Sequence, residues 1–286
     1  MDLAQLPAAA PPPETLLAGV DPLVVSEGLV SQYLGEDWAF VYRNAGYLLR
    51  GAVVTVVLTI TSILLGFLAG FPAGAIEVYG GGYPRAVVRK AGVLLRGTPI
   101  LVIIIFAFFV LPIGALAGPI NGLVGLLNAV LRALSAPFGS TAVVLPTVSA
   151  AFVAATVALG FRSAAYQSQI FRGALGSVDE GQMEAARSIG MTRLEAIRYV
   201  IVPQAMRRSV PGFQNEFTIV LKDTSIAFAI GLGELLKNSE DLFHQQTTAV
   251  LEVFLFASLV YFVLTFGTNR TLDFVNNYFA IPGEST

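Results

Sequence analysis

Residues 47–71 read YLLRGAVVTVVLTITSILLGFLAGF, and this stretch restricts the fold more than any other. It contains one charged residue, Arg50, followed by an unbroken run of apolar and small uncharged residues. A helix needs about 20 apolar residues to cross the hydrocarbon core of a bilayer, because each residue adds about 1.5 Å along its axis. The stretch is long enough and therefore predicts a membrane-spanning helix.

The composition of the whole chain agrees with a protein embedded in lipid. Of the 286 residues, 55% are hydrophobic and 13% are charged, whereas a soluble domain has about 25% charged residues. This excludes a soluble enzyme, and the net charge of −2 excludes a general nucleic-acid binder. The chain has no cysteine and a single histidine, His244, so we expect no disulfide, no metal site and no catalytic residue.

Four further stretches are long and apolar enough to cross a bilayer, at residues 93–111, 142–170, 210–232 and 250–268. The stretch 210–232 is weaker because it contains charged residues, but a helix that lines a protected interior tolerates them. The sequence therefore predicts an all-α membrane protein, a five-span helical bundle within residues 46–272.

Residues 112–146, between the second and third predicted spans, allow two interpretations. Apolar residues recur at helical spacing from Leu123 to Leu134, while Asn121 and Arg132 interrupt them. We expect an amphipathic helix that lies in the membrane interface. A short additional span is the alternative.

The N-terminal residues 1–45 are acidic, and Lys and Arg are absent from residues 1–42. A secretory signal would need a basic start followed by an apolar core, so this segment is not one. We expect an extracytoplasmic tail with an interfacial helix or turn near Trp38. The alternative is a tail without structure up to about residue 30.

The placement of Lys and Arg predicts the orientation, because cytoplasmic segments carry an excess of both. Most of the 17 basic residues fall in two predicted cytoplasmic segments: Arg85, Arg89, Lys90 and Arg96, then Arg172, Arg187, Arg193, Arg198, Arg207 and Arg208. Five spans then place the N-terminus outside and the tail 273–286 in the cytoplasm.

The segment that begins at Asp179 predicts two short helices around a glycine corner. Asp179 can cap the first helix and Gly190 can end it. Thr192 and Glu195 have the spacing of a capping box at the start of the second helix, which Pro203 would stop. We expect a rigid element that presents a face to a soluble partner.

Within this segment, Glu184-Ala185-Ala186 is followed by Gly190 and then by Val200-Ile201-Val202-Pro203. The pattern, which covers residues 179–205, resembles the EAA loop of permease subunits in ABC importers. Four further strings resemble the polar amino-acid permeases in particular: Arg96-Gly97-Thr98-Pro99, Phe171-Arg172-Gly173, Pro203-Gln204-Ala205 and Lys222-Asp223-Thr224-Ser225. Gln169 and Ile103 depart from that family, where many members carry Glu and Gln.

The resemblance implies a type I importer subunit of the bacterial inner membrane that forms half of a translocation path. It implies four kinds of partner: a cytoplasmic ABC ATPase dimer, a second permease that is a copy or a paralogue, an extracytoplasmic amino-acid-binding protein, and the amino-acid cargo. The ATPase would dock on the loop through Glu184, Ala185, Ala186, Gly190 and Pro203. The chain has no Gly-x4-Gly-Lys-Ser/Thr string, so we expect no enzyme activity and no cofactor of its own, with ATP used by the partner.

Charged residues inside the predicted spans are the candidate path residues, since each costs at least about 2.5–3.5 kcal/mol at the bilayer centre. They are Arg162, Glu216, Lys222 and Asp223, and we add the neighbouring amide Asn215 to this set. One hypothesis is that they line the path and meet the carboxylate and ammonium groups of an amino acid. The other is internal pairing, in which Arg162 binds Glu216 or Asp223 and fixes the helix packing.

Two rival functions follow from the same residues. A secondary transporter or channel would use Arg162, Glu216 and Asp223 as an ion relay, but it leaves the two-helix cytoplasmic segment without a role. An ABC permease for a different small polar solute keeps that segment and changes only the cargo.

Overall fold

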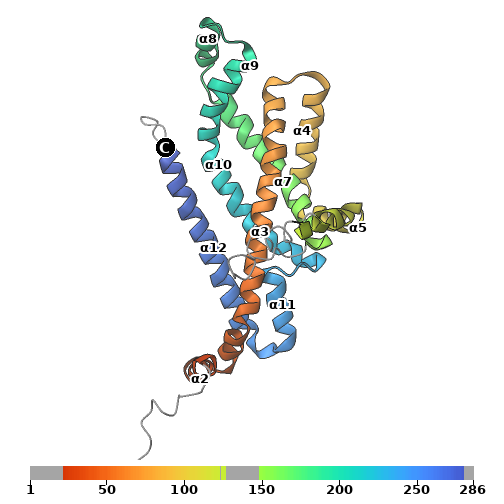
Figure 1. Cartoon of the computed structure of the whole chain (residues 1–286), viewed down its shortest axis with the longest axis vertical. Coiled ribbons are helices and arrows are strands. Elements are labelled where there is room, and N and C mark those ends of the chain that lie inside the picture. The colour runs from red at the N-terminus through yellow and green to blue at the C-terminus, as the bar shows by residue number, and fades with distance from the viewer. Residues whose placement is uncertain (1–21, 123, 127–147, 280–286) are drawn as a thin grey trace, which may run out of the picture.

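The computed structural model describes residues 22–122, 124–126 and 148–279, and all regular structure in this part of the chain is helical. The long helices run roughly along the longest axis of the molecule (Figure 1). The short helices α8 and α9 lie at one end of this axis, and α2 lies at the other. The predicted all-α class is confirmed.

The first two helices are α2 (Pro22–Leu34) and α3 (Glu36–Tyr79), joined at Gly35, whose φ of 95° favours glycine. Helix α3 has 44 residues, which corresponds to about 66 Å. It contains the predicted span 47–71, but it starts ten residues before the predicted domain boundary at residue 46. Helix α2 lies within residues 21–42, where an interfacial helix or turn was expected, but Trp38 belongs to α3. Residues 1–21 fall outside the described chain.

The predicted second span, residues 93–111, is wrong as a single helix. Helix α4 (Gly82–Gly97) and helix α5 (Ile100–Phe109) meet at a bend of 105°. Thr98 between them is extended, since the residue before a proline is disfavoured in the helical region, and Pro99 cannot donate a backbone hydrogen bond. Arg85, Arg89, Lys90 and Arg96, the basic residues of the first predicted cytoplasmic segment, all lie on α4.

The segment after α5 begins with the 3-10 helix η1 (Pro112–Leu116) and continues as helix to residue 126, apart from residue 123, which is not described. The rest of the expected interfacial helix lies outside the described residues. The side-chain amide of Asn121 donates to the carbonyl of Val148 at 2.9 Å and its oxygen accepts from the Val148 N–H at 2.6 Å. Asn121 thus joins the helix that follows η1 to the residues just before residue 150, where the next described helix begins.

Helix α7 (Ala150–Gly176) packs along α3. The contact runs over Gly66, Gly70 and Gly74, which are spaced four residues apart on one face of α3. An added Cβ at Gly70 would lie 2.7 Å from the carbonyl oxygen of Ala164, too close for any side chain. Small residues are therefore required here because the two backbones nearly touch.

The cytoplasmic segment of the prediction folds as α8 (Glu180–Ser188), α9 (Arg193–Ala196) and the π-helix η3 (Ile197–Ile201). Helix α10 (Val202–Asp223) follows without a break, so the expectation that Pro203 stops the helix is wrong. Proline is tolerated in the first turn of a helix, and here the Val202 N–H already bonds the carbonyl of Ile197, five residues back. The π turn leaves room for Pro203.

The predicted span 210–232 is not one α-helix either, because its second part is a 3-10 helix. Helix α10 ends at Asp223, and a 3-10 helix η4 (Thr224–Ile230) continues to the left-handed Gly231. Helix α11 (Leu235–Gln245), the short η5 (Thr247–Ala249) and helix α12 (Val250–Phe279) complete the fold. The buried carboxylate of Glu234 caps α11 and accepts a hydrogen bond from the Tyr261 hydroxyl of α12 at 3.0 Å.

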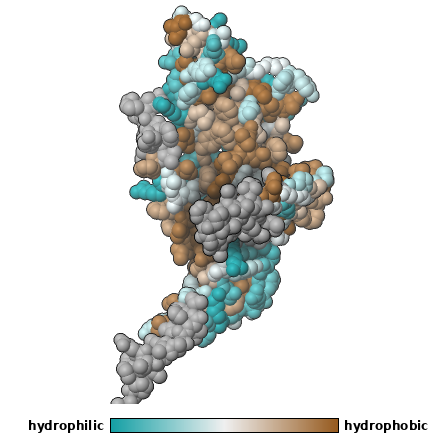
Figure 2. Space-filling model, in the orientation of Figure 1, coloured by the Kyte–Doolittle hydropathy of each residue, from teal (hydrophilic) through white to brown (hydrophobic). Residues whose placement is uncertain are grey.

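On the face shown in Figure 2, an apolar belt covers the middle of the molecule, between more polar ends formed by α8 and α9 and by α11. By length and composition, two described helices can cross a membrane, Glu36–Tyr79 and Thr247–Phe274, and the bent pair α4–α5 would be a third. Helices α7 and α10 carry charged and polar residues and do not meet the same criterion. The count of five spans stays a prediction.

Candidate functional site

The two-helix element at one end of the molecule has the capping contacts that the sequence predicts. The carboxylate of Asp179 accepts from the Gly181 N–H at 2.7 Å, and Gly190 has a φ of 93°. The hydroxyl of Thr192 accepts from the Glu195 N–H at 3.3 Å, while the Glu195 carboxylate accepts from the Thr192 N–H at 2.8 Å. Both helices of the element are therefore fixed at their first turns.

Hydrogen bonds from the side chain and backbone of Thr192 lower the pKa of Glu195 below its ordinary value of 4.5. These bonds stabilise the charged carboxylate, and they are made on a fully exposed helix end. The capping box is thus intact at any neutral pH.

The five predicted coupling residues separate into outward and inward positions. Glu184, Ala185, Gly190 and Pro203 are exposed, whereas Ala186 is buried. The element is anchored below by an apolar cluster that includes Leu175, Ile201 and Ala205, with Met183 packed against it: the full buried set is Ala174, Leu175, Val178, Ile201 and Ala205. The apolar cluster therefore fixes the exposed coupling residues relative to α7 and α10.

Sequence reasoning missed the apolar surface of this element. Ile189, Leu194 and Tyr199 are 76%, 74% and 62% exposed. Large apolar side chains that are exposed on a polar segment are typical of a contact surface. The available signal was their presence among charged residues in a segment that is too short and too charged to cross a membrane.

A pocket of about 360 Å³ lies beneath the element, between the ends of α3 and α7 and the helix α8. Its lining includes Tyr79, Met183, Glu184, Arg193 and Ile201. The pocket places a predicted coupling residue, Glu184, beside the π turn that leads into α10.

Inside the apolar belt, the structure pairs two of the predicted path residues. The guanidinium of Arg162 on α7 lies 2.5 Å from the carboxylate of Asp223 at the end of α10, and both side chains are about four-fifths buried. Next to it, the Ser163 hydroxyl donates to the Glu216 carboxylate at 2.7 Å. Glu216 and Asp223 thus share the face of α10 that contacts α7, as their seven-residue spacing predicts.

The other two predicted residues, Asn215 and Lys222, lie on the exposed side of α10. Lys222 lines a separate pocket of about 240 Å³ with Ser225 of η4 and with Ser258 and Tyr261 of α12. The five candidates therefore do not form one cluster. Arg162, Glu216 and Asp223 are engaged within the chain, and Asn215 and Lys222 are presented outward.

A second buried carboxylate, Glu77 near the end of α3, was not singled out from the sequence. It is 2% exposed, accepts from the Gln169 side chain at 3.1 Å and lies 3.7 Å from the Arg172 guanidinium. Both partners belong to α7. The available signal was the position of Glu77, three residues after Gly74 on the face of α3 that contacts α7.

Comparison with known protein families finds one whose model covers most of the chain. The family model described as "Binding-protein-dependent transport system inner membrane component" matches residues 62–278. This range contains the two-helix element and every candidate path residue.

Individual relatives cover most of the chain. The glutamine transport system permease protein GlnP of Escherichia coli (strain K12) is 29% identical over 229 residues, which is 80% of this chain and 91% of GlnP. The probable glutamine ABC transporter permease protein GlnP of Bacillus subtilis (strain 168) is 30% identical over 230 residues, again 80% and 91%. The glutamate/aspartate import permease protein GltK of Escherichia coli O6:H1 is 26% identical over 240 residues, or 84% and 96%.

Solved structures agree in fold. The crystal structure of an amino acid ABC transporter with histidines matches with a TM-score of 0.63 at 28% identity, covering 82% of this chain and 95% of that one. The inward-facing MetNI methionine ABC transporter matches with a TM-score of 0.57 at 17% identity, covering 82% and 98%, and supports the fold alone.

Proposed function

Because this chain belongs to the family of binding-protein-dependent transport system inner membrane components, we propose that it is the membrane-spanning subunit of an ATP-driven importer of amino acids. The observation that carries this function is the family match, which spans the capped two-helix element with its exposed apolar side chains. A secondary transporter or channel would have no use for that element, and the relatives are permease subunits.

The energy source in this proposal is a separate cytoplasmic ATPase dimer that docks on the loop 179–205. Glu184, Ala185 and Gly190 contribute exposed surface to the contact, flanked by Ile189 and Leu194. Ala186 and Pro203 hold the shape of the element, the first by burial and the second at the start of α10. The chain binds no cofactor of its own, and the ATPase uses the ATP.

The remaining partners are a second permease, either a copy or a paralogue, an extracytoplasmic binding protein and an amino acid as cargo. The proposed orientation has the N-terminus outside the inner membrane and the C-terminus in the cytoplasm, which agrees with the concentration of Lys and Arg around α4 and α8–α10. The names of the relatives favour a polar amino acid.

The path residues of this proposal are Arg162, Asn215, Glu216, Lys222 and Asp223. Asn215 and Lys222 lie on the exposed side of α10, where they can face a second permease or the cargo. Arg162 is paired with Asp223, and Glu216 accepts a hydrogen bond from Ser163. These three residues reach cargo only if the α7–α10 contact rearranges during the cycle.

A matched pair of glycine variants tests the coupling role. Gly190 and Gly35 both have a φ near 94°, at 93° and 95°, and an added Cβ would meet nothing within 4 Å at either one. Replacing either by tryptophan therefore puts an L side chain at a positive φ, but only Gly190→Trp places bulk on the proposed docking surface. We expect Gly190→Trp to abolish ATPase co-purification and amino-acid uptake, and Gly35→Trp to retain ATPase co-purification.

The outcome that contradicts the proposal is ATPase binding and uptake at wild-type level in Gly190→Trp. Loss of both in Gly35→Trp as well would assign the effect to misfolding. Membrane levels of each variant, measured by immunoblotting, separate that result from a specific loss.

A further inference from the structure

Helices α10 and α12 are joined by two hydrogen-bonded pairs of side chains. The Thr218 hydroxyl donates to the side-chain oxygen of Asn269 at 2.7 Å, and the Gln214 amide donates to the carboxylate of Asp273 at 2.7 Å. All four side chains are partly buried. The two residues on each helix are four apart, so the pairs lie one turn from each other along two antiparallel helices. We call these four residues the α10–α12 ladder.

The ladder uses the side of α10 that faces away from α7. Glu216 accepts from Ser163 of α7, whereas Gln214 and Thr218 each lie about 160° around the helix from Glu216. Helix α10 therefore lies between α7 and α12 and has polar contacts with both (Figure 1).

Hydrogen bonds of this kind fix the register of two helices more firmly than apolar packing does. An apolar side chain can slide along a neighbouring helix, but a polar group that leaves its partner in an apolar interior finds no water to replace it. One turn beyond Thr218, the same two helices line the pocket that Lys222 shares with Ser258 and Tyr261. The ladder is thus a local tie, and the contact is looser farther along α10.

The position of the ladder relates it to the two-helix element. Helix α9, the π-helix η3 and α10 form one continuous helical segment, so α10 follows directly from that element. Helix α12 packs against α10, α11 and α3. A displacement of the two-helix element therefore has a direct route to α12 through α10, and the ladder is the polar part of that contact.

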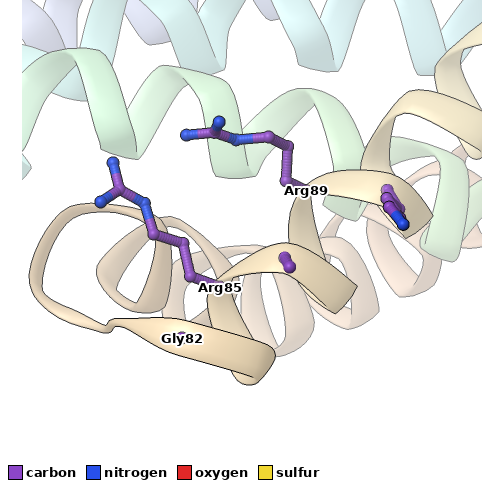
Figure 3. Close-up of a pocket in the computed structure, with 5 residues that line it drawn as sticks. Gly82, Arg85 and Arg89 are labelled. Carbon is purple, nitrogen blue, oxygen red and sulfur yellow. The ribbon is translucent and has the colours of Figure 1, made fainter.

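A charged surface in the same half of the molecule lacks such fixed contacts. Arg85 and Arg89 of α4 extend toward α7 (Figure 3), and among the described residues neither makes a hydrogen bond or an ion pair. Substitution of Arg89 therefore changes the charge of this half of the molecule without breaking a described contact, which makes it a control for the ladder.

We propose that Gln214, Thr218, Asn269 and Asp273 are positioning residues that make α10 and α12 move as one unit, so that a displacement of the two-helix element reaches the last helix. The inference rests on the proposed function, because it requires a partner that moves the element. None of the four residues belongs to the proposed docking surface or to the proposed path.

An exchange of donor and acceptor tests the first pair. Q214E places a second carboxylate opposite Asp273 and removes the donor, whereas Q214E/D273N restores one donor and one acceptor in reverse order. The measured quantity is the number of glutamine or glutamate molecules imported per ATP hydrolysed, in vesicles that contain the complex with its ATPase and binding protein. We expect this ratio to fall about threefold or more in Q214E, which is the average effect of one interhelical hydrogen bond. Q214E/D273N should recover it, and R89Q, which changes the net charge by the same amount, should keep it.

Thr218 gives an independent test of the second pair. T218V removes the bond to Asn269 together with a bond to the Gln214 carbonyl of its own helix at 3.1 Å. T271V is the matched control, since the exposed Thr271 hydroxyl bonds only the Gly267 carbonyl of its own helix, at 2.8 Å. We expect the ratio to fall about threefold in T218V and to stay at the wild-type value in T271V and in T218S, which keeps the hydroxyl.

ATPase co-purification and melting temperature separate positioning from a purely structural role. Positioning predicts that Q214E and T218V retain the ATPase and hydrolyse ATP while they import less per ATP. A wild-type ratio in both variants would overturn the inference. So would a fall that follows the melting temperature or that Q214E/D273N does not recover. A wild-type chain that retains no ATPase and imports nothing would instead overturn the proposed function, and this inference with it.

Discussion

At the scale of single residues, the ion pair between Arg162 and Asp223 is the most informative contact. A charge left unpaired in an apolar interior is far more costly than a paired one, and removal of one partner of a buried pair typically destabilises by about 3–5 kcal/mol. The pair joins α7 to the point where α10 becomes a 3-10 helix. The ion pair therefore stabilises the packing of α7 against α10, whether or not the two residues also bind cargo.

Single and double neutral variants separate the two roles. We expect Arg162→Gln and Asp223→Asn each to lower the thermal stability of the purified chain by a few kcal/mol, and the double variant to recover most of this loss because no charge is left alone. If the residues also meet cargo, uptake stays lost in the double variant although stability returns. Melting temperature and reconstituted uptake, measured on the same three proteins, give the answer.

Recovery of uptake together with stability would remove both residues from the path. Uptake in Arg162→Gln equal to that of the wild type would do the same for Arg162 alone. Asn215→Ala serves as a comparison for thermal stability alone, since Asn215 is exposed and its loss leaves no buried charge.

At the scale of elements, two kinds of contact set the geometry: capping at α8 and α9, and close backbone packing between α3 and α7. The caps were predictable because each uses residues that are near in sequence. The packing was predictable in type from the glycine spacing, but the partner helix was not, because nothing in a single sequence indicates which face a glycine stripe will meet.

The capping box predicts a specific effect of Thr192. Replacement of Thr192 by alanine removes the hydroxyl that caps the helix and should destabilise its first turn by about 1 kcal/mol, while Thr192→Ser should not. Hydrogen exchange of the amides from residue 193 to residue 197 should therefore be roughly fivefold faster in Thr192→Ala. Equal exchange in Thr192→Ala and Thr192→Ser would contradict the contact.

The same box has a defined pH dependence. The pKa of Glu195 is lowered in the folded state, so the stabilisation it provides is fully present above the ordinary value of 4.5 and is lost as the pH falls below it. Between pH 6 and pH 8 we expect no change in the ATPase interaction from this group.

The glycine stripe predicts a sharp contrast along one helix. An added methyl group at Gly70 would meet the Ala164 backbone at 2.7 Å, whereas at Gly46 it would meet nothing within 4 Å. Gly70→Ala should lower stability by about 1–3 kcal/mol through overpacking, and Gly46→Ala should be neutral or raise it by up to about 1 kcal/mol through helix propensity. Thermal unfolding in detergent measures both, and equal melting temperatures would show that the α3–α7 distance relaxes freely.

At the scale of the whole molecule, α3 is longer than a membrane is thick. Its length of about 66 Å exceeds the roughly 40–45 Å of a bilayer with its headgroups, so it tilts, projects or does both. At one end, Asp37 accepts hydrogen bonds from Gln246 and Thr248 at 2.7 Å each, which ties α3 to the start of α12. Helix α3 is thus joined to the segment that leads into the last helix, at the end that we assign to the outside.

The absence of cysteine from the sequence makes the orientation directly measurable. Gln32→Cys and Ser188→Cys are both at exposed positions, at opposite ends of the molecule. We expect a membrane-impermeant thiol reagent added to intact cells to label Gln32→Cys and to label Ser188→Cys only after the cells are opened. Labelling of Ser188→Cys in intact cells would reverse the topology and would contradict the proposed coupling to a cytoplasmic ATPase.

How far the sequence predicted this molecule depended on the range of each interaction. The helical class, the stretch 47–71 inside α3, the caps at Asp179 and Thr192, and the shared face of Glu216 and Asp223 all follow from local periodicity and spacing. Local periodicity and spacing did not predict the 105° bend at Pro99 or the continuation of the helix through Pro203, although both involve proline. Proline removes one backbone donor in either case, and whether the chain bends or widens into a π turn is decided by the helices packed around it.

The unbroken backbone from Arg193 to Asp223 has a consequence for inhibition. The pocket of about 360 Å³ touches Ile201, inside the π turn, and it shares no lining residue with the Lys222 pocket. We expect a small molecule bound there to hold the continuous helix of η3 and α10 in one position. It would stop the importer at every cargo concentration, and resistance to it would arise among the residues of that pocket, such as Met183 and Tyr79, and not among those that recognise the nutrient.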